Sequence, residues 1–431
     1  MKIVLIVPGT GGAFYCENCI RDLNLAAGLI EHGHEVWVLP LYLPLMPGEP
    51  PPENVCPVFY GAVSLYLGHV SPLFRKLPRG FRKLFDSAPM LKFATKRAGS
   101  TRATGLEDLT LSMLNGETGG QRDELNRMIT WLSTNIKPDA VHLSNALLIG
   151  LAHRLKHDLG ALVGCALQDE DTWVDAMDGN YPRQVWDLMA NRAQDVDAFF
   201  PVSHTYANLM QNRMKIPAVK LNVVHNGIDA YAFTPAAKTT TPPVIGYLSR
   251  LCDSLGLEIL VDAFITLKQE SQFKFLKLRA IGGSTHDDAP LLNRLHQKLE
   301  QAGILDDAQF LQHFDRPARA RFLADLTLMS VPARQGEAFG MYQLEALACK
   351  VPIVQPALGA FPEVIELTGG GITYTPNNAD ALAQALKSLL LDHDRLQALA
   401  RKGFDNIQKK FTMQTMAMQT AKVYETIGTA S

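Results

Sequence analysis

Short apolar, β-branched runs alternate with helical stretches along most of this 431-residue chain, and the alternation occurs in two successive sets. The first set opens with a predicted strand at residues 2–7, a glycine loop, a helix from about residue 20 to 32 and a strand at 36–39. The second set begins at Val244. Such alternation is typical of parallel sheets covered by helices. The sequence therefore predicts an α/β chain with two Rossmann-like domains.

The boundary between the two sets lies at a turn. Residues 220–225 have the composition of a strand, and Asn226-Gly227 favours a turn because both residues readily take positive φ. Residues 236–243, rich in Thr and Pro, read as a linker. We assign residues 1–225 to an N-terminal domain, 226–243 to a hinge and 244–412 to a C-terminal domain.

Composition excludes several classes of protein. A net charge of −2 implies no strong polyelectrolyte partner, so nucleic acid is not expected. No run of eighteen apolar residues predicts a spanning helix, and six scattered cysteines argue against a disulfide scaffold. The first residues read as a strand that ends in a glycine loop, rather than as a signal peptide. We therefore expect a cytoplasmic protein.

The first glycine loop, residues 8–13, invites a dinucleotide interpretation. That interpretation fails twice: Phe14 stands where the third glycine belongs, and no acidic residue ends the second strand. Gly11 and Gly12 still permit close approach of a substrate to the backbone.

A second glycine loop combines an anion site with two carboxylates. A predicted strand at 326–331 leads through Gly336 and Gly340 to a predicted helix at 342–348, whose free N–H groups suit an anion. Glu337 lies in the loop and Glu345 just over one turn into the helix. Carboxylates accept strong hydrogen bonds from sugar hydroxyls. The loop therefore suits a ligand that carries hydroxyls beside phosphates, as a nucleotide sugar does.

The sequence EAFGMYQLE at residues 337–345 resembles the donor-site signature of the retaining glycosyltransferases of family four, which have the GT-B fold. Ala-Cys-Lys-Val-Pro-Ile-Val at 348–354, Gly-Ala-Phe-Pro-Glu at 359–363 and His-Asn-Gly at 225–227 are also similar to that family. The resemblance implies two Rossmann-like domains facing across a cleft. The first would face the acceptor, the second would bind the nucleotide sugar, and a last helix at 413–431 would pack back on the first.

The resemblance also implies roles for single residues. Glu337 would contact the donor sugar, Glu345 the ribose hydroxyls, and Arg250 the leaving diphosphate. The backbone at the remaining donor positions would approach the sugar and phosphates: Gly11, Gly12, Phe339, Gly340 and Met341. No metal or cofactor is expected, because helix ends and Arg250 do the work of a cation.

Two positions depart from the family pattern. Many members carry a His at or near position 168, where this chain has Gln168, whose amide can bind a hydroxyl but cannot take a proton. Asp169, or its neighbours Glu170 and Asp171, would partly replace it. The usual Lys after Arg250 is Leu255. A replacement charge could come from three basic residues: Arg334, Lys350 or Arg316.

Other motifs have two interpretations each. Cys16 and Cys19 could bind zinc, but no second pair accompanies them, so two small residues at a helix start are favoured. Asp169 and Asp171 match a D-x-D metal motif, although adjacent acids usually form a solvated loop. Residues 70–102 interleave bases with Phe and Leu, which suits either peripheral contact with the inner membrane face or a solvated surface.

These observations predict a retaining glycosyltransferase that moves a sugar from a nucleoside-diphosphate sugar to a glycan, lipid-linked or small-molecule acceptor. Gln168 and Leu255 keep a second class open, a catalytically weak relative that acts as a binding or partner subunit. A nucleotide-sugar epimerase on the same fold is a third.

Overall fold

The computed structural model describes residues 1–9, 12, 14–45, 49–50, 52–60, 105–235 and 242–430. Residues 70–102, which include the basic and aromatic segment, lie outside the described residues. The chain divides into two compact units. One comprises Met1–Gly12, Asn18–His225 and Gln414–Ser431, and the other comprises Ala13–Glu17 and Asn226–Met413.

The first unit is built on a five-stranded parallel sheet with the order β2-β1-β3-β4-β5. Its strands are almost wholly buried, as expected when both faces of a parallel sheet are covered, and this is why their sequences are nearly continuous apolar runs. The register pairs Ile3 with Val36 on one side and with Ala140 on the other. The strands are β1 (Lys2–Val7), β2 (Glu35–Pro40), β3 (Ala140–Leu143), β4 (Leu162–Leu167) and β5 (Ala198–Pro201).

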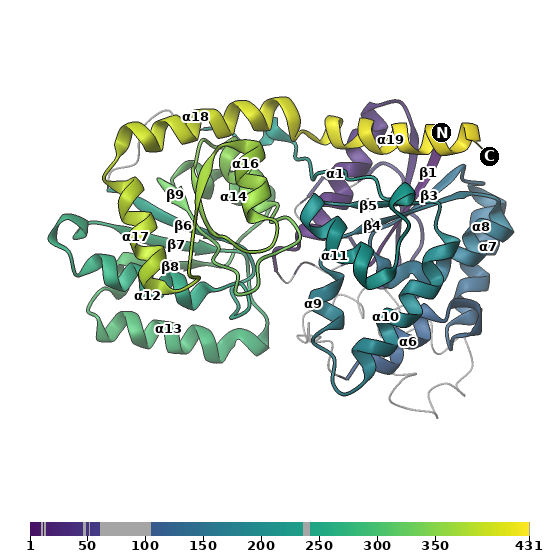
Figure 1. Ribbon diagram of the computed structural model, residues 1–431, viewed down its shortest axis with the longest axis horizontal. Helices are drawn as coiled ribbons and strands as arrows, with labels where there is room; N and C mark the ends of the chain where they lie inside the picture. The colour runs from purple at the N-terminus through teal and green to yellow at the C-terminus, as the bar shows by residue number, and fades with distance from the viewer. Residues whose placement is uncertain are drawn as a thin grey trace. The chain divides into compact units, whose positions relative to one another are not determined.

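Helices connect these strands and cover the sheet (Figure 1). Where a cap is present it follows simple chemistry: the Ser203 side chain accepts a hydrogen bond from the N–H of Tyr206 at the start of α11. The helices are α1 (Glu17–Glu31), α6 (Glu107–Leu114), α7 (Arg122–Asn135), α8 (Ala152–Leu159), α9 (Glu170–Val174), α10 (Tyr181–Arg192), α11 (His204–Met214) and α19 (Met413–Ala430), with 3₁₀ turns η2 (Ala146–Leu151) and η3 (Ala193–Asp195) among them.

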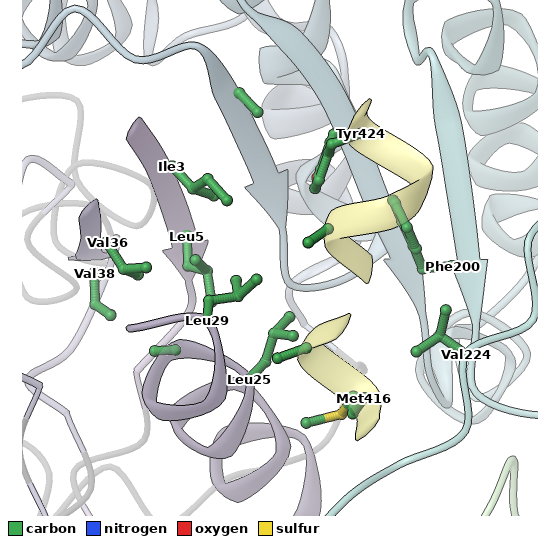
Figure 2. Close-up of a cluster of buried hydrophobic side chains, with 14 of the residues drawn as sticks. Ile3, Leu5, Leu25, Leu29, Val36, Val38, Phe200, Val224, Met416 and Tyr424 are labelled. Carbon is green, nitrogen blue, oxygen red and sulfur yellow. The ribbon is translucent and has the colours of Figure 1, made fainter. Parts of the chain in front are cut away.

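The last helix contributes side chains to the core of the first unit. Met416 and Tyr424 of α19 lie in one buried cluster with Leu5, Leu25 and Phe200 (Figure 2). The Tyr424 hydroxyl lies 2.9 Å from Nδ1 of His142. The C-terminal residues of the chain therefore complete a core that begins with its first strand.

The second unit is built on a six-stranded parallel sheet with the order β11-β10-β9-β6-β7-β8. The chain runs from β6 outward to β7 and β8, then returns to the other side of β6 as β9. The carboxyl ends of strands at such a reversal are where open α/β sheets bind ligands. The strands are β6 (Val244–Leu248), β7 (Lys277–Ile281), β8 (Ala308–Leu311), β9 (Leu328–Met329), β10 (Ile353–Pro356) and β11 (Gly371–Tyr374).

Seven helices of the described chain belong to the second unit. They are α12 (Leu257–Lys268), α13 (Ala289–Gln301), α14 (Arg316–Ala324), α15 (Tyr342–Ala348), α16 (Phe361–Thr368), α17 (Ala379–Leu390) and α18 (His393–Lys410). The prediction of two parallel-sheet, Rossmann-like units is confirmed. Within the described residues, no helix combines the length and the apolar character needed to cross a membrane.

Three predicted strands differ from the structure. Residues 220–225 form only an isolated pairing of Leu221 with Phe199, because the chain enters them from a 3₁₀ turn at Ala218–Lys220. The sequence also predicts a strand over residues 274–281, but this strand starts at Lys277, since Leu276 still closes a turn on Phe273. The strand expected at 326–331 is only Leu328–Met329, because Leu326 is held in the turn that ends α14.

We expect Tyr424→Ala to destabilise the first unit by about 3–5 kcal/mol, as removal of buried aromatic rings does elsewhere. Tyr424→Phe should cost only about 1 kcal/mol, because it keeps the ring and loses one hydrogen bond. All four tryptophans precede residue 225, so guanidinium unfolding followed by tryptophan fluorescence reports on this unit. Equal losses in the two variants would contradict the packing of α19 against the core.

Candidate functional site

The loop between β9 and α15 holds Glu337 against a buried tyrosine. The Tyr342 hydroxyl donates a short hydrogen bond to Oε2 of Glu337. Burial, and then the Glu337 carboxylate, hold the pKa of Tyr342 well above its usual range, so the phenol stays a donor. Gln355 of β10 supports the loop, since its Oε1 accepts from the N–H of Val331 at 3.0 Å. Glu337 itself is only half-buried.

The start of α15 already binds a carboxylate. Residues Ala13–Glu17 group with the second unit, and Oε2 of Glu17 accepts from the N–H of Met341 at 2.6 Å. Gly340 precedes this contact with a φ of +81°, and a Cβ there would lie 2.7 Å from Nε2 of Gln343. That amide is in turn held by the carbonyl of the buried Phe339 at 2.7 Å. The backbone at Gly340 and Met341 is therefore shaped to present an N–H group to an anion.

Glu345 does not lie open to solvent. Its two oxygens accept from Nε and Nη2 of Arg319, each at 3.0 Å, and the two side chains are 0% and 1% exposed. Arg319 also donates to the carbonyl of Phe314 at 2.9 Å, and its guanidinium lies 5.3 Å from the ring centre of Tyr15. The spacing predicted a carboxylate available to a ribose, and the structure shows one that is already paired with a buried arginine.

Arg250 follows β6 and is fixed by the carboxylate of Asp288, which ends the 3₁₀ turn His286–Asp288 after β7. Its Nε and Nη2 donate to Oδ2 and Oδ1 of Asp288, both at 3.0 Å, and Nη2 also donates to Thr285 at 2.8 Å. The guanidinium lies 5.2 Å from the ring centre of Phe14. Arg250 therefore has a set position at the carboxyl end of the central strand.

Tyr247 relates this arginine to the Glu337 loop. Its hydroxyl donates to the carbonyl of Arg250 at 2.8 Å. Burial chiefly holds its pKa well above the usual range, with Glu337 and Asp288 raising it and Arg250 lowering it. Tyr247 therefore holds the backbone that carries Arg250, and its pKa also responds to the Glu337 carboxylate. That Arg250 and Glu337 serve one donor site stays a prediction.

The basic residues proposed to replace the missing Lys all have contacts of their own. Arg334 donates from Nη2 to Oδ1 of Asp253 at 2.7 Å and from Nε to Oδ2 at 3.1 Å. Arg316 pairs with Asp229 at 3.0 Å. Lys350 lies 4.8 Å from the ring centre of Phe404. Arg334, which the sequence offered as a replacement for the missing Lys, is therefore already paired with the carboxylate of Asp253.

In the first unit, Gln168 at the end of β4 is buried and held in place. Its Nε2 donates to the carbonyl of Ser144 at 2.7 Å, and its N–H donates to Oε2 of Glu170 at 2.8 Å. Its Oε1 is buried and forms no hydrogen bond with the described part of the chain. The amide therefore keeps one acceptor that a hydroxyl could use.

Beside Gln168 lies a buried group of polar residues that the sequence analysis missed. Arg21 donates to Asp22 at 3.0 Å and lies 3.3 Å from Nε2 of His142, while Ser144 donates a short hydrogen bond to Asp22. Burial raises the pKa of Asp22 and lowers that of His142 well below its usual range. The available signal was the charged Arg21-Asp22 pair, which stands between Ile20 and Leu23 in α1.

Two of the three acids after Gln168 make contacts within the first unit. Glu170 is buried and accepts from the N–H of Ala146 and from the Tyr206 hydroxyl, each at 2.8 Å. Oδ1 of Asp171 lies 2.8 Å from the same hydroxyl, and Asp169, with a φ of +61°, immediately precedes α9. Within the described residues, the groups that could hold a metal ion include neither Asp169 nor Asp171. Gly12 has a φ of +77°, whereas Gly11 lies outside the described residues.

Comparison with known proteins gives the family. The profile "Glycosyltransferase Family 4" matches residues 116–231, and "Glycosyl transferases group 1" matches residues 232–405. The chain is a member of the GT-B glycosyltransferases. All six cysteines are free, so none forms a disulfide bond.

Several GT-B proteins show how far the likeness extends. Sucrose-phosphate synthase from Thermosynechococcus elongatus has a TM-score of 0.72 at 19% identity over 100% of both chains. Anabaena HepE, solved with UDP and glucose, has a TM-score of 0.67 at 15% identity over 99% of both. D-inositol 3-phosphate glycosyltransferase of Jonesia denitrificans is 26% identical over 48% of this chain and 51% of its own. The chain spans about half the length of the curated relatives it matches.

The buried Glu170 gives a prediction on pH. Burial raises its pKa to about 7 from the model-compound 4.5, so the folded state keeps a proton that the unfolded state loses. Its contribution to stability therefore falls as pH rises through this window. We expect the free energy of unfolding of the native protein, relative to Glu170→Gln, to fall by about 2 kcal/mol between about pH 5 and pH 8.

Tryptophan fluorescence during urea unfolding at a series of pH values measures this difference. The lowered pKa of His142 has the opposite effect on stability: the free energy of unfolding falls as pH drops below 6.5. This effect cancels in the comparison because the native protein and Glu170→Gln both contain His142. A difference that does not change with pH would contradict a raised Glu170 pKa.

Proposed function

We propose that this protein transfers a sugar from a nucleoside-diphosphate sugar, with retention of configuration, to a glycan, lipid-linked or small-molecule acceptor. The observation that carries the proposal is the loop at residues 337–345, which combines an N–H group already bound to a carboxylate with the half-buried Glu337. HepE, solved in complex with UDP and glucose, shares the fold. The D-inositol 3-phosphate glycosyltransferase is 26% identical over 48% of this chain.

In the donor site, a phosphate oxygen would take the place of the Glu17 carboxylate at the N–H of Met341, beside Gly340 and Phe339. Arg250, held by Asp288, would stabilise the charge that develops on the leaving diphosphate. Glu337 would accept a hydrogen bond from the donor sugar. These groups supply positive charge and donors without a metal ion.

Glu345 can still serve the ribose. A carboxylate offers about four lone-pair sites, so Glu345 is proposed to accept from a ribose hydroxyl as well as from Arg319. A ribose hydroxyl would therefore donate to a carboxylate that Arg319 has already oriented. Gln168, through its Oε1, and the neighbouring Asp169 are proposed to act beside the reacting sugar, and the backbone of Gly11 and Gly12 is proposed to approach the sugar and phosphates of the donor.

A second candidate is a nucleotide-sugar-binding subunit without turnover, and an epimerase is a third. Leu255 and the pairing of Arg250 and Arg334 with carboxylates favour the second, because they leave little unpaired positive charge for a leaving diphosphate.

Cytoplasmic location, and contact with the inner membrane face through residues 70–102, stay predictions.

A panel of nucleotide sugars, measured by the thermal shift of the native protein, tests donor binding. At least one donor should raise the melting temperature, because a ligand that binds only the folded state stabilises it. Glu337→Gln should remove most of that shift, while Glu366→Gln, an exposed carboxylate on α16, should keep it. No shift with any donor, or equal shifts in both variants, would contradict the proposal.

Leu255→Lys tests whether the site lacks a cation. We expect the new ammonium to tighten binding of the matching nucleoside diphosphate by about 1.5–3 kcal/mol, the range for hydrogen bonds to charged groups. Calorimetric titration measures the affinity, and Leu255→Met, uncharged and of similar size, is the control. Equal affinities in the two variants would show that the existing basic residues suffice.

A further inference from the structure

Two histidines and an aspartate converge in the first unit, outside every contact described above. His153 and His157 lie on α8, and Asp195 ends η3. One ligand atom from each of the three side chains lies within 4.8 Å of the other two. Nδ1 of His153 is 3.4 Å from Oδ1 of Asp195, and the two imidazole centres are 4.4 Å apart.

The backbone fixes this arrangement. Residues four apart on a helix share one face, so α8 presents both imidazoles to the same side. Asp195 comes from a different element that contacts α8, which makes the three ligands a link across the tertiary structure.

The neighbouring arginine does not occupy the aspartate. Arg192 donates to Glu117 at 2.9 Å and to the carbonyl of Asn115 at 2.6 Å, and it stays 3.9 Å from Oδ2 of Asp195. Its hydrogen bonds are therefore made elsewhere, and Oδ1 of Asp195 faces His153. The His153 side chain is 41% exposed and that of Asp195 is 12% exposed, so an ion can reach the group from solvent.

We propose that His153, His157 and Asp195 bind a divalent transition-metal ion of the zinc class. Two imidazoles and one carboxylate are ligands that zinc prefers, whereas calcium and magnesium prefer oxygen. Tetrahedral zinc with ligand bonds of about 2.0–2.1 Å places ligand atoms about 3.4 Å apart, which is the separation of His153 and Asp195. Water completes the coordination, and the ion fastens α8 to the segment that leads into β5.

The test uses tag-free protein stripped with a chelator and titrated with zinc against a chromophoric competitor. We expect one zinc ion to bind this group and to raise the melting temperature. His157→Ala, which alters an exposed side chain, should weaken this binding by at least about tenfold and abolish the thermal shift. Asp195→Asn should weaken it as well. His32→Ala, another exposed histidine of the same unit, should bind as the native protein does.

Cobalt distinguishes this site from the six free thiols. At a site of two histidines and a carboxylate, bound cobalt should show visible d–d bands without a thiolate charge-transfer band. Zinc affinity that is the same in His157→Ala and in the native protein would overturn the proposal. So would a thiolate band in the cobalt spectrum that persists in His157→Ala.

Discussion

An ion pair wholly removed from solvent, between Arg319 of α14 and Glu345 of α15, underlies the candidate donor site. Loss of one partner of such a pair costs about 3–5 kcal/mol, because the other charge is left buried alone. Helix α15 therefore has one favourable position against α14. Tyr342 and Met341 begin that helix, so the pair also sets the phenol that holds Glu337 and the N–H that binds an anion.

The sequence predicted elements well where local signals decide them. The sequence predicts helices at residues 257–268 and 342–348, and both begin and end there, because glycines precede both and their compositions favour helix. The strand expected at 326–331 has only two residues in the structure, because pairing with β6 and β10 sets its length. Those partner strands are distant in the chain, and local composition carries no information about them.

The candidate site shows the same division. The family resemblance predicted Glu337 and Arg250 as site residues, yet local sequence could not reveal that Asp288, 38 residues away, fixes Arg250. Nor could it reveal that Asp253, 81 residues away, balances Arg334. The buried Arg21 and Asp22 were missed because a charged pair on a helix is usually solvated. A carboxylate's partner decides what it can bind, and that partner is a tertiary property.

We propose that the loop at Glu337 and the arginine at position 250 together support transfer of a sugar from a nucleoside-diphosphate sugar. Proton NMR of the anomeric signals tests this most directly, recorded while the protein acts on the nucleotide sugar it binds in the presence of candidate acceptors. We expect free nucleoside diphosphate and a first-formed glycoside with the anomeric configuration of the donor. A first-formed product of inverted configuration, or an epimerised nucleotide sugar without release of diphosphate, would contradict it.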